Sequence, residues 1–280
     1  MNQKAIFDKV SFKASRMTTL AYSTSFSLGI KLLYRKLQDP IFSIYGFVRF
    51  ADEIVDTFHE YDKETLLAEF RQQTYEAIER GISMNPILNS FQETVNKYNI
   101  ENELIETFLK SMEMDLDQNA HSRHSYDEYI VGSAEVVGLM CLRVFTNGDD
   151  EQYQALKPNA MKLGAAFQKI NFLRDLKADY NDLGRMYFPN LDMSEFSEDV
   201  KKKIEDEIAD DFRMGYEGIK KLPKQARIGV YLAYVYYIAL FKKIKKTPSS
   251  KVMEQRIRVP NSRKYFLLAG SYVRHQLDMI

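Results

Sequence analysis

Apolar residues recur three and four positions apart along most of this chain, which is the spacing of one face of an α-helix. The pattern is clear between Pro40 and Pro86 and again between Pro86 and Pro158. In the first of these stretches the apolar positions include Ile44, Phe47, Val48, Ala51 and Val55. Sustained alternation of apolar and polar residues, which is typical of half-buried strands, is scarce. The pattern predicts an all-α protein with roughly eight to twelve helices.

Few helix-breaking residues interrupt this pattern, since only 7 prolines and 12 glycines occur among 280 residues. Clusters of Gly, Pro, Asn, Asp and Ser predict loops at 37–40, 81–86, 146–150, 181–184 and 247–250. The sequence contains no repeat of the kind that builds solenoids and no low-complexity tract. We therefore interpret residues 1–280 as a single domain.

Composition and charge narrow the possible functions. With 45% hydrophobic and 28% charged residues the chain is typical of a globular protein. Its 39 basic and 39 acidic residues give zero formal net charge, which excludes a general nucleic-acid binder because such proteins carry surplus Lys and Arg. The single cysteine, Cys141, cannot form an internal disulfide and fits a reducing compartment. The longest nearly uncharged apolar run, residues 230–241, is too short to span a bilayer. We expect a cytoplasmic protein.

Two pairs of aspartates stand out because each is spaced i and i+4 inside an apolar helical pattern. Asp52 and Asp56 form one pair, and Asp175 and Asp179 form the other. Residues at this spacing share a helix face, so two like charges there repel each other unless a cation is present. Mg²⁺ prefers carboxylate and phosphate oxygens. Two facing pairs would therefore suit a Mg²⁺-bound diphosphate.

A second interpretation of these pairs is ordinary ion pairing on helix surfaces. Arg49 precedes Asp52 by three residues, and Arg174 and Lys177 flank Asp175. Zinc is a poor candidate, since the four histidines do not have suitable spacing for a zinc site. Ion pairing and metal binding both remain open from the residues alone.

The sequence around the pairs resembles the squalene/phytoene synthase family. Three stretches carry the resemblance, residues 22–29 (YSTSFSLG), 44–56 (IYGFVRFADEIVD) and 168–180 (QKINFLRDLKADY), the last continued by GRMYFP at 184–189. A weaker fourth stretch is YIVGSAEVVGLM at 129–140. Glu135 and Tyr22 depart from the family, where a small residue and a histidine are common. The resemblance, most of all to bacterial phytoene synthases, implies an isoprenoid-synthase helical bundle around a central apolar tunnel.

The resemblance also implies roles for particular residues. It assigns the Mg²⁺ to four catalytic aspartates: Asp52, Asp56, Asp175 and Asp179. It places two catalytic aromatic residues, Tyr45 and Tyr129, along the tunnel. It implies that the substrate diphosphate and the reacting carbons are contacted by Ser23, Ser25, Arg49, Gln168, Asn171, Arg185, Tyr187, Tyr237 and Arg256. For the last of these, Arg258 and Arg263 are alternatives.

Structural roles are the competing interpretation for several of these residues. Ser23 and Ser25 would then cap a helix, since serine is a preferred N-cap residue. Gln168 and Asn171 would form a satisfied buried network, because buried amides need partners. The tyrosines would pack in the core.

The activity that the resemblance implies is head-to-head condensation of two prenyl diphosphates. We expect two geranylgeranyl diphosphates to give 15-cis-phytoene through prephytoene diphosphate, in carotenoid biosynthesis. The alternative is a farnesyl diphosphate-using squalene or dehydrosqualene synthase that passes through presqualene diphosphate. The expected cofactor is Mg²⁺, with Mn²⁺ as a substitute, and NADPH is not expected. A helical scaffold protein without catalytic activity is the non-enzymatic alternative.

The zero net charge conceals two oppositely charged segments. Residues 192–211 hold nine acidic and three basic side chains, whereas residues 242–274 hold ten basic and one acidic. A solvated helix face is the simple interpretation of each run. The basic run also suits a diphosphate or an anionic lipid surface. We therefore expect peripheral association with the inner membrane face, while the sequence leaves the oligomeric state open.

Overall fold

A computed structural model describes residues 2–116, 123–183, 188, 196–277 and 280, and within them every regular element is helical. The α-helices are α1 (Gln3–Tyr22), α2 (Thr24–Leu32), α3 (Arg35–Asp56), α4 (Lys63–Arg80), α5 (Pro86–Tyr98), α6 (Asn102–Met114), α7 (Arg123–Ile130), α8 (Val136–Phe145), α9 (Asp150–Leu183), α10 (Glu198–Lys221), α11 (Lys224–Lys245), α12 (Ser249–Glu254) and α13 (Asn261–Gln276). A single π-helical turn, η1 (Val131–Glu135), joins α7 to α8. The all-α prediction is confirmed, although these residues already contain one α-helix more than the expected maximum of twelve.

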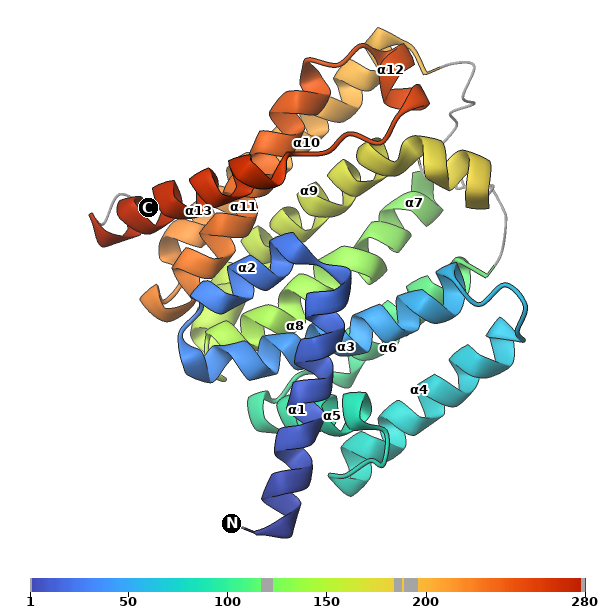
Figure 1. The fold of residues 1–280 in the computed structure, drawn as a ribbon, viewed down its shortest axis with the longest axis vertical. Coiled ribbons are helices and arrows are strands. Elements are labelled where there is room, and N and C mark those ends of the chain that lie inside the picture. Colours follow the sequence, from blue (N-terminus) through green and yellow to red (C-terminus); the bar gives the residue numbers. More distant parts are fainter. Residues whose placement is uncertain (1, 117–122, 184–187, 189–195, 278–279) are drawn as a thin grey trace.

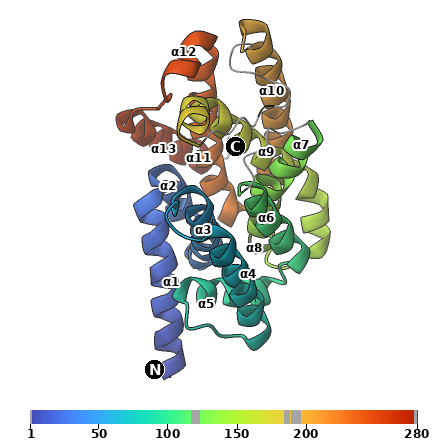
Figure 2. The ribbon, with the colours of Figure 1, turned by 90° about the vertical axis from the view of Figure 1, so that its right-hand side faces the viewer.

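The helices form two packed groups, and α8 and η1 lie between them, since both contact α6 of the first group and α9 of the second. In the first group α1 crosses α3 and α5, and α4 and α6 complete it (Figure 1). In the second group α10 packs along α9, while α11 contacts α2, α9 and α13. The turned view places α1, α2 and α13 along the same side of the molecule (Figure 2). The helices that carry the two aspartate segments, α3 and α9, therefore come from different groups.

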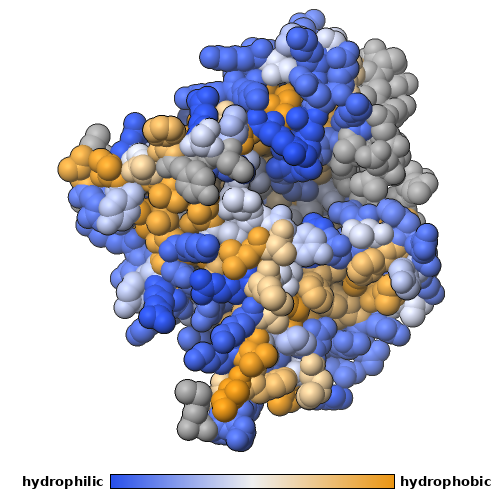
Figure 3. Space-filling model, viewed as in Figure 1, coloured by the Kyte–Doolittle hydropathy of each residue, from blue (hydrophilic) through white to orange (hydrophobic). Residues whose placement is uncertain are grey.

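The molecular surface is mixed in character. In the view of Figure 3, polar side chains cover much of the face, while apolar ones gather over α13 and along α1. In the part of the chain that the structure describes, no helix combines the length and the hydrophobicity that a membrane span requires.

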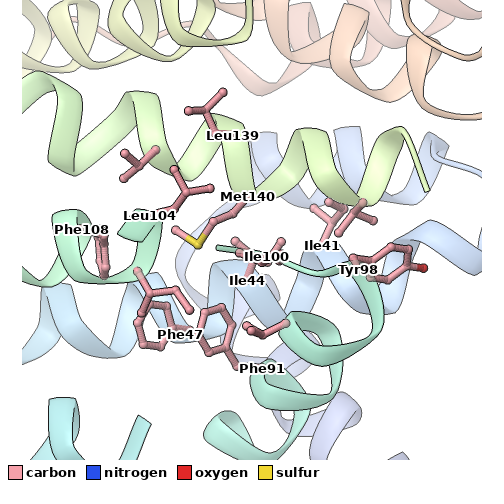
Figure 4. Packing of buried hydrophobic residues seen from close by; sticks show 14 of the residues in the cluster. Ile41, Ile44, Phe47, Phe91, Tyr98, Ile100, Leu104, Phe108, Leu139 and Met140 are labelled. Carbon is pink, nitrogen blue, oxygen red and sulfur yellow. The ribbon is translucent and has the colours of Figure 1, made fainter. Parts of the chain in front are cut away.

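The core of the first group is built around α3, whose buried side chains follow the helical spacing that the sequence predicts. Phe47 lies at its centre and stacks on Phe91 of α5, with ring centroids 3.9 Å apart. Phe108 of α6 contacts the same ring (Figure 4). Phe70 of α4 stacks on it as well. Burial of large aromatic side chains is a major favourable contribution to folding. This packing fixes α3 and with it the aspartates in its last turn.

Glycine permits two close helix contacts near the centre of the molecule. A Cβ at Gly229 of α11 would lie 2.6 Å from the Gly29 carbonyl oxygen of α2. A Cβ at Gly132 in η1 would lie 2.5 Å from the Cβ of Ser111 in α6. Real Cβ atoms do not approach other atoms so closely, so any larger residue would separate these helices.

Two of the five predicted loops, 81–86 and 146–150, agree with the structure. Gly81, with φ +67°, ends α4, and Asn85 caps α5, which begins with Pro86. Asn147 and Gly148, both with positive φ, join α8 to α9. The loop predicted at 37–40 is wrong, because these residues lie inside α3. Pro40 is in the second turn, where its ring removes only one backbone hydrogen bond and α3 continues.

The loop predicted at 247–250 agrees only in its first half, because α12 begins at Ser249. The loop predicted at 181–184 begins too early, because α9 continues through Leu183. Its last residue, 184, lies outside the described residues.

Candidate active site

A cavity of about 470 Å³ lies between α2, α3, η1, α8, α9 and α11, and we call it the central cavity. One end is charged and the rest is mostly apolar. The residues predicted from sequence that line it are Tyr45, Arg49, Asp52, Asp56, Tyr129, Gln168, Asn171, Asp175 and Tyr237. The fold thus brings side chains from α3, α7, α9 and α11 to one space.

The α3 side of the charged end holds Asp52 and Asp56. Burial raises the pKa of the Asp52 carboxyl to about 7. The negative charges of Asp56 and Asp115 act in the same direction, whereas the positive charge of Arg49 lowers the pKa. Arg49 pairs with Glu53, lies 3.8 Å from Asp52 and stacks on the Tyr22 ring. The Nε of Arg49 is buried and finds no hydrogen-bond partner among the described residues. An unpaired donor beside two close carboxylates suits an anion and a cation bound together.

The α9 side of the charged end is centred on Asp175. Its carboxylate pairs with Arg174 at 2.5 Å and with Nε of Arg256 at 2.6 Å. Arg256 lies between α12 and α13, so this ion pair connects the C-terminal region to the site. The backbone of α9 continues through Asp179, but the Asp179 side chain lies outside the described residues, as do Arg185 and Tyr187.

A polar network crosses the middle of the cavity. The Tyr237 hydroxyl donates to Oδ1 of Asn171 at 3.2 Å, and the Asn171 amide donates to Oε1 of Gln168 at 3.3 Å. Burial raises the pKa of Tyr237 to about 12, so its hydroxyl keeps its proton near neutral pH. These hydrogen bonds agree with the interpretation of Gln168 and Asn171 as members of a buried polar network. Both residues also line the cavity.

Asp115, at the end of α6, lines the cavity and was not predicted from the sequence. Asp115 is 6% exposed, and its carboxylate accepts a hydrogen bond of 2.7 Å from the Tyr129 hydroxyl. The contact fixes the Tyr129 ring, which also packs on Phe172. A lone aspartate at a helix end carries no sequence signal, so only the fold shows that it joins the site.

Aromatic rings line the next part of the cavity. Tyr237 stacks on Phe167 with centroids 4.1 Å apart, and Phe26 contacts both rings. The rest of the lining is mostly aliphatic and includes Phe145, with Ser133 and Asn159 as polar exceptions. Cys141 also lines this region, and burial raises the pKa of its thiol to about 12, so it is a poor nucleophile.

The two predicted serines lie at the start of α2 rather than on the cavity wall. Ser23 is the N-cap of α2 and accepts a hydrogen bond from Phe26 N–H, which agrees with the capping interpretation. Burial raises the pKa of Tyr45, and the neighbouring Ser23 side chain acts in the opposite direction. Ser25 lies in the first turn of α2, half-buried. Ser23 therefore lies close to the cavity wall at Tyr45.

The residues at the charged end fit a Mg²⁺-bound diphosphate. Among the described residues no three His, Cys, Asp or Glu side chains converge into a complete metal site. Mg²⁺ does not require such a cage, because it binds through one or two carboxylates together with phosphate oxygens and water. Asp52 and Asp56 could supply the carboxylates, and the free Nε of Arg49 could donate to the phosphate.

Comparison with known proteins agrees with this geometry. The family model for squalene/phytoene synthase matches residues 19–263. The chain belongs to the squalene/phytoene synthase family. This is a prenyltransferase family, and the matched segment contains every site residue discussed above.

Individual relatives within the family carry different names. A presqualene diphosphate synthase of Rhodopseudomonas palustris is 30% identical over 175 residues, which cover 61% of this chain and 60% of that protein. A phytoene synthase of Arthrospira platensis is 24% identical over 291 residues, which cover 94% of this chain and 93% of that protein. Among solved structures, a dehydrosqualene synthase superposes with a TM-score of 0.79 at 19% identity, covering 96% of this chain and 98% of that one. This likeness confirms the isoprenoid-synthase fold of the family.

We expect the Asp115–Tyr129 hydrogen bond to act as one unit in catalysis. Tyr129→Phe and Asp115→Asn should each lower kcat by about tenfold, and the double variant should lower it by little more than either alone. The measurement is a double-mutant cycle on kcat, with thermal unfolding to show that the variants fold. Additive losses would contradict a shared role.

Proposed function

We propose that this protein condenses two geranylgeranyl diphosphates head to head, giving 15-cis-phytoene through prephytoene diphosphate. The observation that supports the proposal most is the polarity of the central cavity. Its charged end joins Arg49, Asp52, Asp56 and Asp175, and its remainder is mostly apolar and partly lined by aromatic rings. A prenyl diphosphate has the same polarity, with a charged head and a hydrocarbon tail.

Each group of residues has a defined task in this proposal. When bound at Asp52, Asp56, Asp175 and Asp179, Mg²⁺ would neutralise the diphosphate charge. Arg49 donates to the diphosphate oxygens, and Asn171 and Gln168 orient the chain at the reacting carbons. We assign a similar contact with the head group to Arg256, Arg185 and Tyr187.

The aromatic part of the cavity has a second task, because ionisation of an allylic diphosphate leaves a carbocation. The rings of Phe26, Phe167 and Tyr237 surround this region. Aromatic faces attract positive charge, and the apolar lining excludes water that would capture the cation. The hydroxyls of Tyr45 and Tyr129 lie nearer the charged end and hold the polar wall in place.

The runner-up activity uses farnesyl diphosphate and yields presqualene diphosphate, squalene or dehydrosqualene. The relative at 30% identity, named a presqualene diphosphate synthase, favours it. The relative named a phytoene synthase matches nearly the full chain and favours the first proposal. We do not expect NADPH to be required.

The deciding experiment incubates the purified protein with labelled C15 or C20 prenyl diphosphate, with Mg²⁺ or Mn²⁺, and with or without NADPH. We expect phytoene from the C20 substrate without NADPH. Products from the C15 substrate alone would support the runner-up. If neither substrate is condensed, the remaining alternative is a helical scaffold protein without catalytic activity.

We also propose that the protein rests on an anionic membrane surface through α13, where the apolar substrate and product would partition. Phe266 and Val273 of α13 and Leu277, the residue that follows it, are spaced seven and four positions apart and so share one face. They are 78%, 54% and 64% exposed. Apolar side chains gather over this helix in Figure 3. The basic residues of α13 include Arg263, Lys264 and Arg274, and the helix contains no acidic residue. Exposed apolar residues with basic neighbours favour an interface with anionic lipid.

Vesicle co-sedimentation tests this surface. Phe266→Ser/Leu277→Ser should weaken binding to vesicles that contain phosphatidylglycerol by about fivefold or more. Met84→Ser is the control, because Met84 is 84% exposed on the loop before α5. Binding by the double variant equal to that of the control would contradict the proposal. Neutralising Lys242, Lys243, Lys245 and Lys246 tests the neighbouring basic segment in the same assay.

A further inference from the structure

A second cavity of about 780 Å³ lies behind the apolar end of the central cavity. Phe145, the last residue of α8, lines both cavities. Phe12 of α1, Leu37 of α3, Tyr98 of α5 and Gln225 of α11 also line the second cavity.

The partition between the two cavities is thin. Leu33 lines the central cavity, whereas the next residue, Tyr34, lines the second cavity. Likewise, just before α11, Leu222 lines the central cavity and Pro223 lines the second cavity. Tyr34 is 54% exposed, so the second cavity is open to solvent. The half-buried Phe145 ring is the side chain common to both spaces, and a change of its rotamer would alter the partition between them.

We propose that the second cavity is the exit site for a long hydrocarbon product, with the Phe145 ring as its movable partition. This inference rests on the proposed function, which makes such a product at the centre of the molecule. The opposite end of the central cavity is lined by Arg49, Asp52 and Asp175, and an uncharged hydrocarbon gains nothing from passing these charges.

Among the buried side chains of the second cavity, Leu37, Pro40 and Tyr98 are apolar or aromatic. Four charged residues also line this cavity: Lys36, Asp39 and Lys97, which are exposed, and Glu93, which is half-buried. A hydrocarbon would therefore follow the buried apolar side and meet the exposed charges only where the cavity opens to solvent.

Partial blockage of the second cavity from its outer side tests the proposal. Gln225 is exposed in the first turn of α11, and its backbone carbonyl accepts the Tyr34 N–H, a bond that does not depend on the side chain. Gln225→Trp therefore narrows the second cavity without touching the central cavity. Gln72→Trp on α4, at an exposed position that lines neither cavity, is the matched control.

We expect Gln225→Trp to keep the single-turnover rate of the wild-type protein but to lower steady-state turnover by about fivefold, because release becomes limiting. Product should then remain bound to the variant during gel filtration. Steady-state turnover equal to that of Gln72→Trp overturns the proposal. An equal loss in single and multiple turnover also overturns it, because the substitution would then act on chemistry rather than release.

A binding measurement keeps the test independent of activity. The chain contains no tryptophan, so the introduced residue is its only one. We expect 1-bromohexadecane to quench the fluorescence of Gln225→Trp by about half at saturation and to leave Gln72→Trp nearly unchanged. If no prenyl diphosphate is condensed, the proposed function is wrong. The quenching measurement still shows whether the second cavity binds a hydrocarbon. Equal quenching of both variants overturns it.

Discussion

Asp52→Asn is expected to lower the rate of condensation by about 10³-fold while the protein stays folded. Asparagine has nearly the same shape as aspartate, so the packing at the end of α3 should survive. It lacks the negative charge through which Asp52 would hold Mg²⁺ next to the diphosphate. The measurement is kcat/KM at saturating Mg²⁺, together with thermal unfolding of both proteins.

Stability should change in the opposite direction to activity. The pKa of Asp52 is about 7 in the folded protein, compared with 3.8 for an ordinary aspartate. A carboxyl whose pKa is raised by folding destabilises the folded protein when it ionises. The free energy of unfolding of the wild-type protein should therefore fall as pH rises from about 4 to about 7. The side-chain amide of the variant does not ionise, so Asp52→Asn in metal-free buffer should show a Tm advantage that grows over this range and then levels.

Asp210→Asn is the control for both measurements, because Asp210 is an exposed residue of α10 that pairs only with Arg213 in the described structure. It should change neither kcat/KM nor Tm appreciably. An Asp52→Asn protein that retains activity, or that unfolds at a lower temperature throughout, would contradict the role assigned to the α3 pair.

The parts of the fold that follow from local spacing could be predicted from the sequence. The buried face of α3 repeats every three to four residues, and the same spacing placed Asp52 and Asp56 on one face. The loop at 81–86 was predictable because Gly81 and Asn85–Pro86 stop and start helices through local chemistry. Pro40 was misread, because the sequence does not show that tertiary packing of α3 outweighs the backbone hydrogen bond that the proline removes.

The parts that depend on tertiary contacts could not be predicted. Asp115 enters the site only because α6 ends beside Tyr129, 14 residues further along the chain. The ion pair between Asp175 and Arg256 joins residues 81 positions apart. The second cavity has walls from α1, α3, α5, α8 and α11, and no sequence motif marks such a space.

A buried ion pair holds α9, the helix that carries Gln168, Asn171 and Asp175, against α10. Lys169 is 8% exposed and Asp211 is 5% exposed, and Nζ of Lys169 donates to Oδ2 of Asp211 at 2.7 Å. Glu207 lies 3.6 Å from the same ammonium group, and Lys162 lies 3.3 Å from Asp211. Removing one member of a buried pair leaves the other charge poorly compensated, which is more costly than losing an exposed pair.

Lys169→Met should therefore lower the free energy of unfolding by about 3 kcal/mol and lower Tm by about 6 °C. Lys202→Met is the matched control, since Lys202 and Asp206 form an exposed i,i+4 pair on α10 whose loss should cost only about 0.5 kcal/mol. Adding Asp211→Leu to Lys169→Met should recover much of the loss, because two apolar side chains can pack where the charges were. Equal Tm values for Lys169→Met and Lys202→Met would show that this pair does not hold α9 in place, and that other contacts of α9 position Gln168, Asn171 and Asp175.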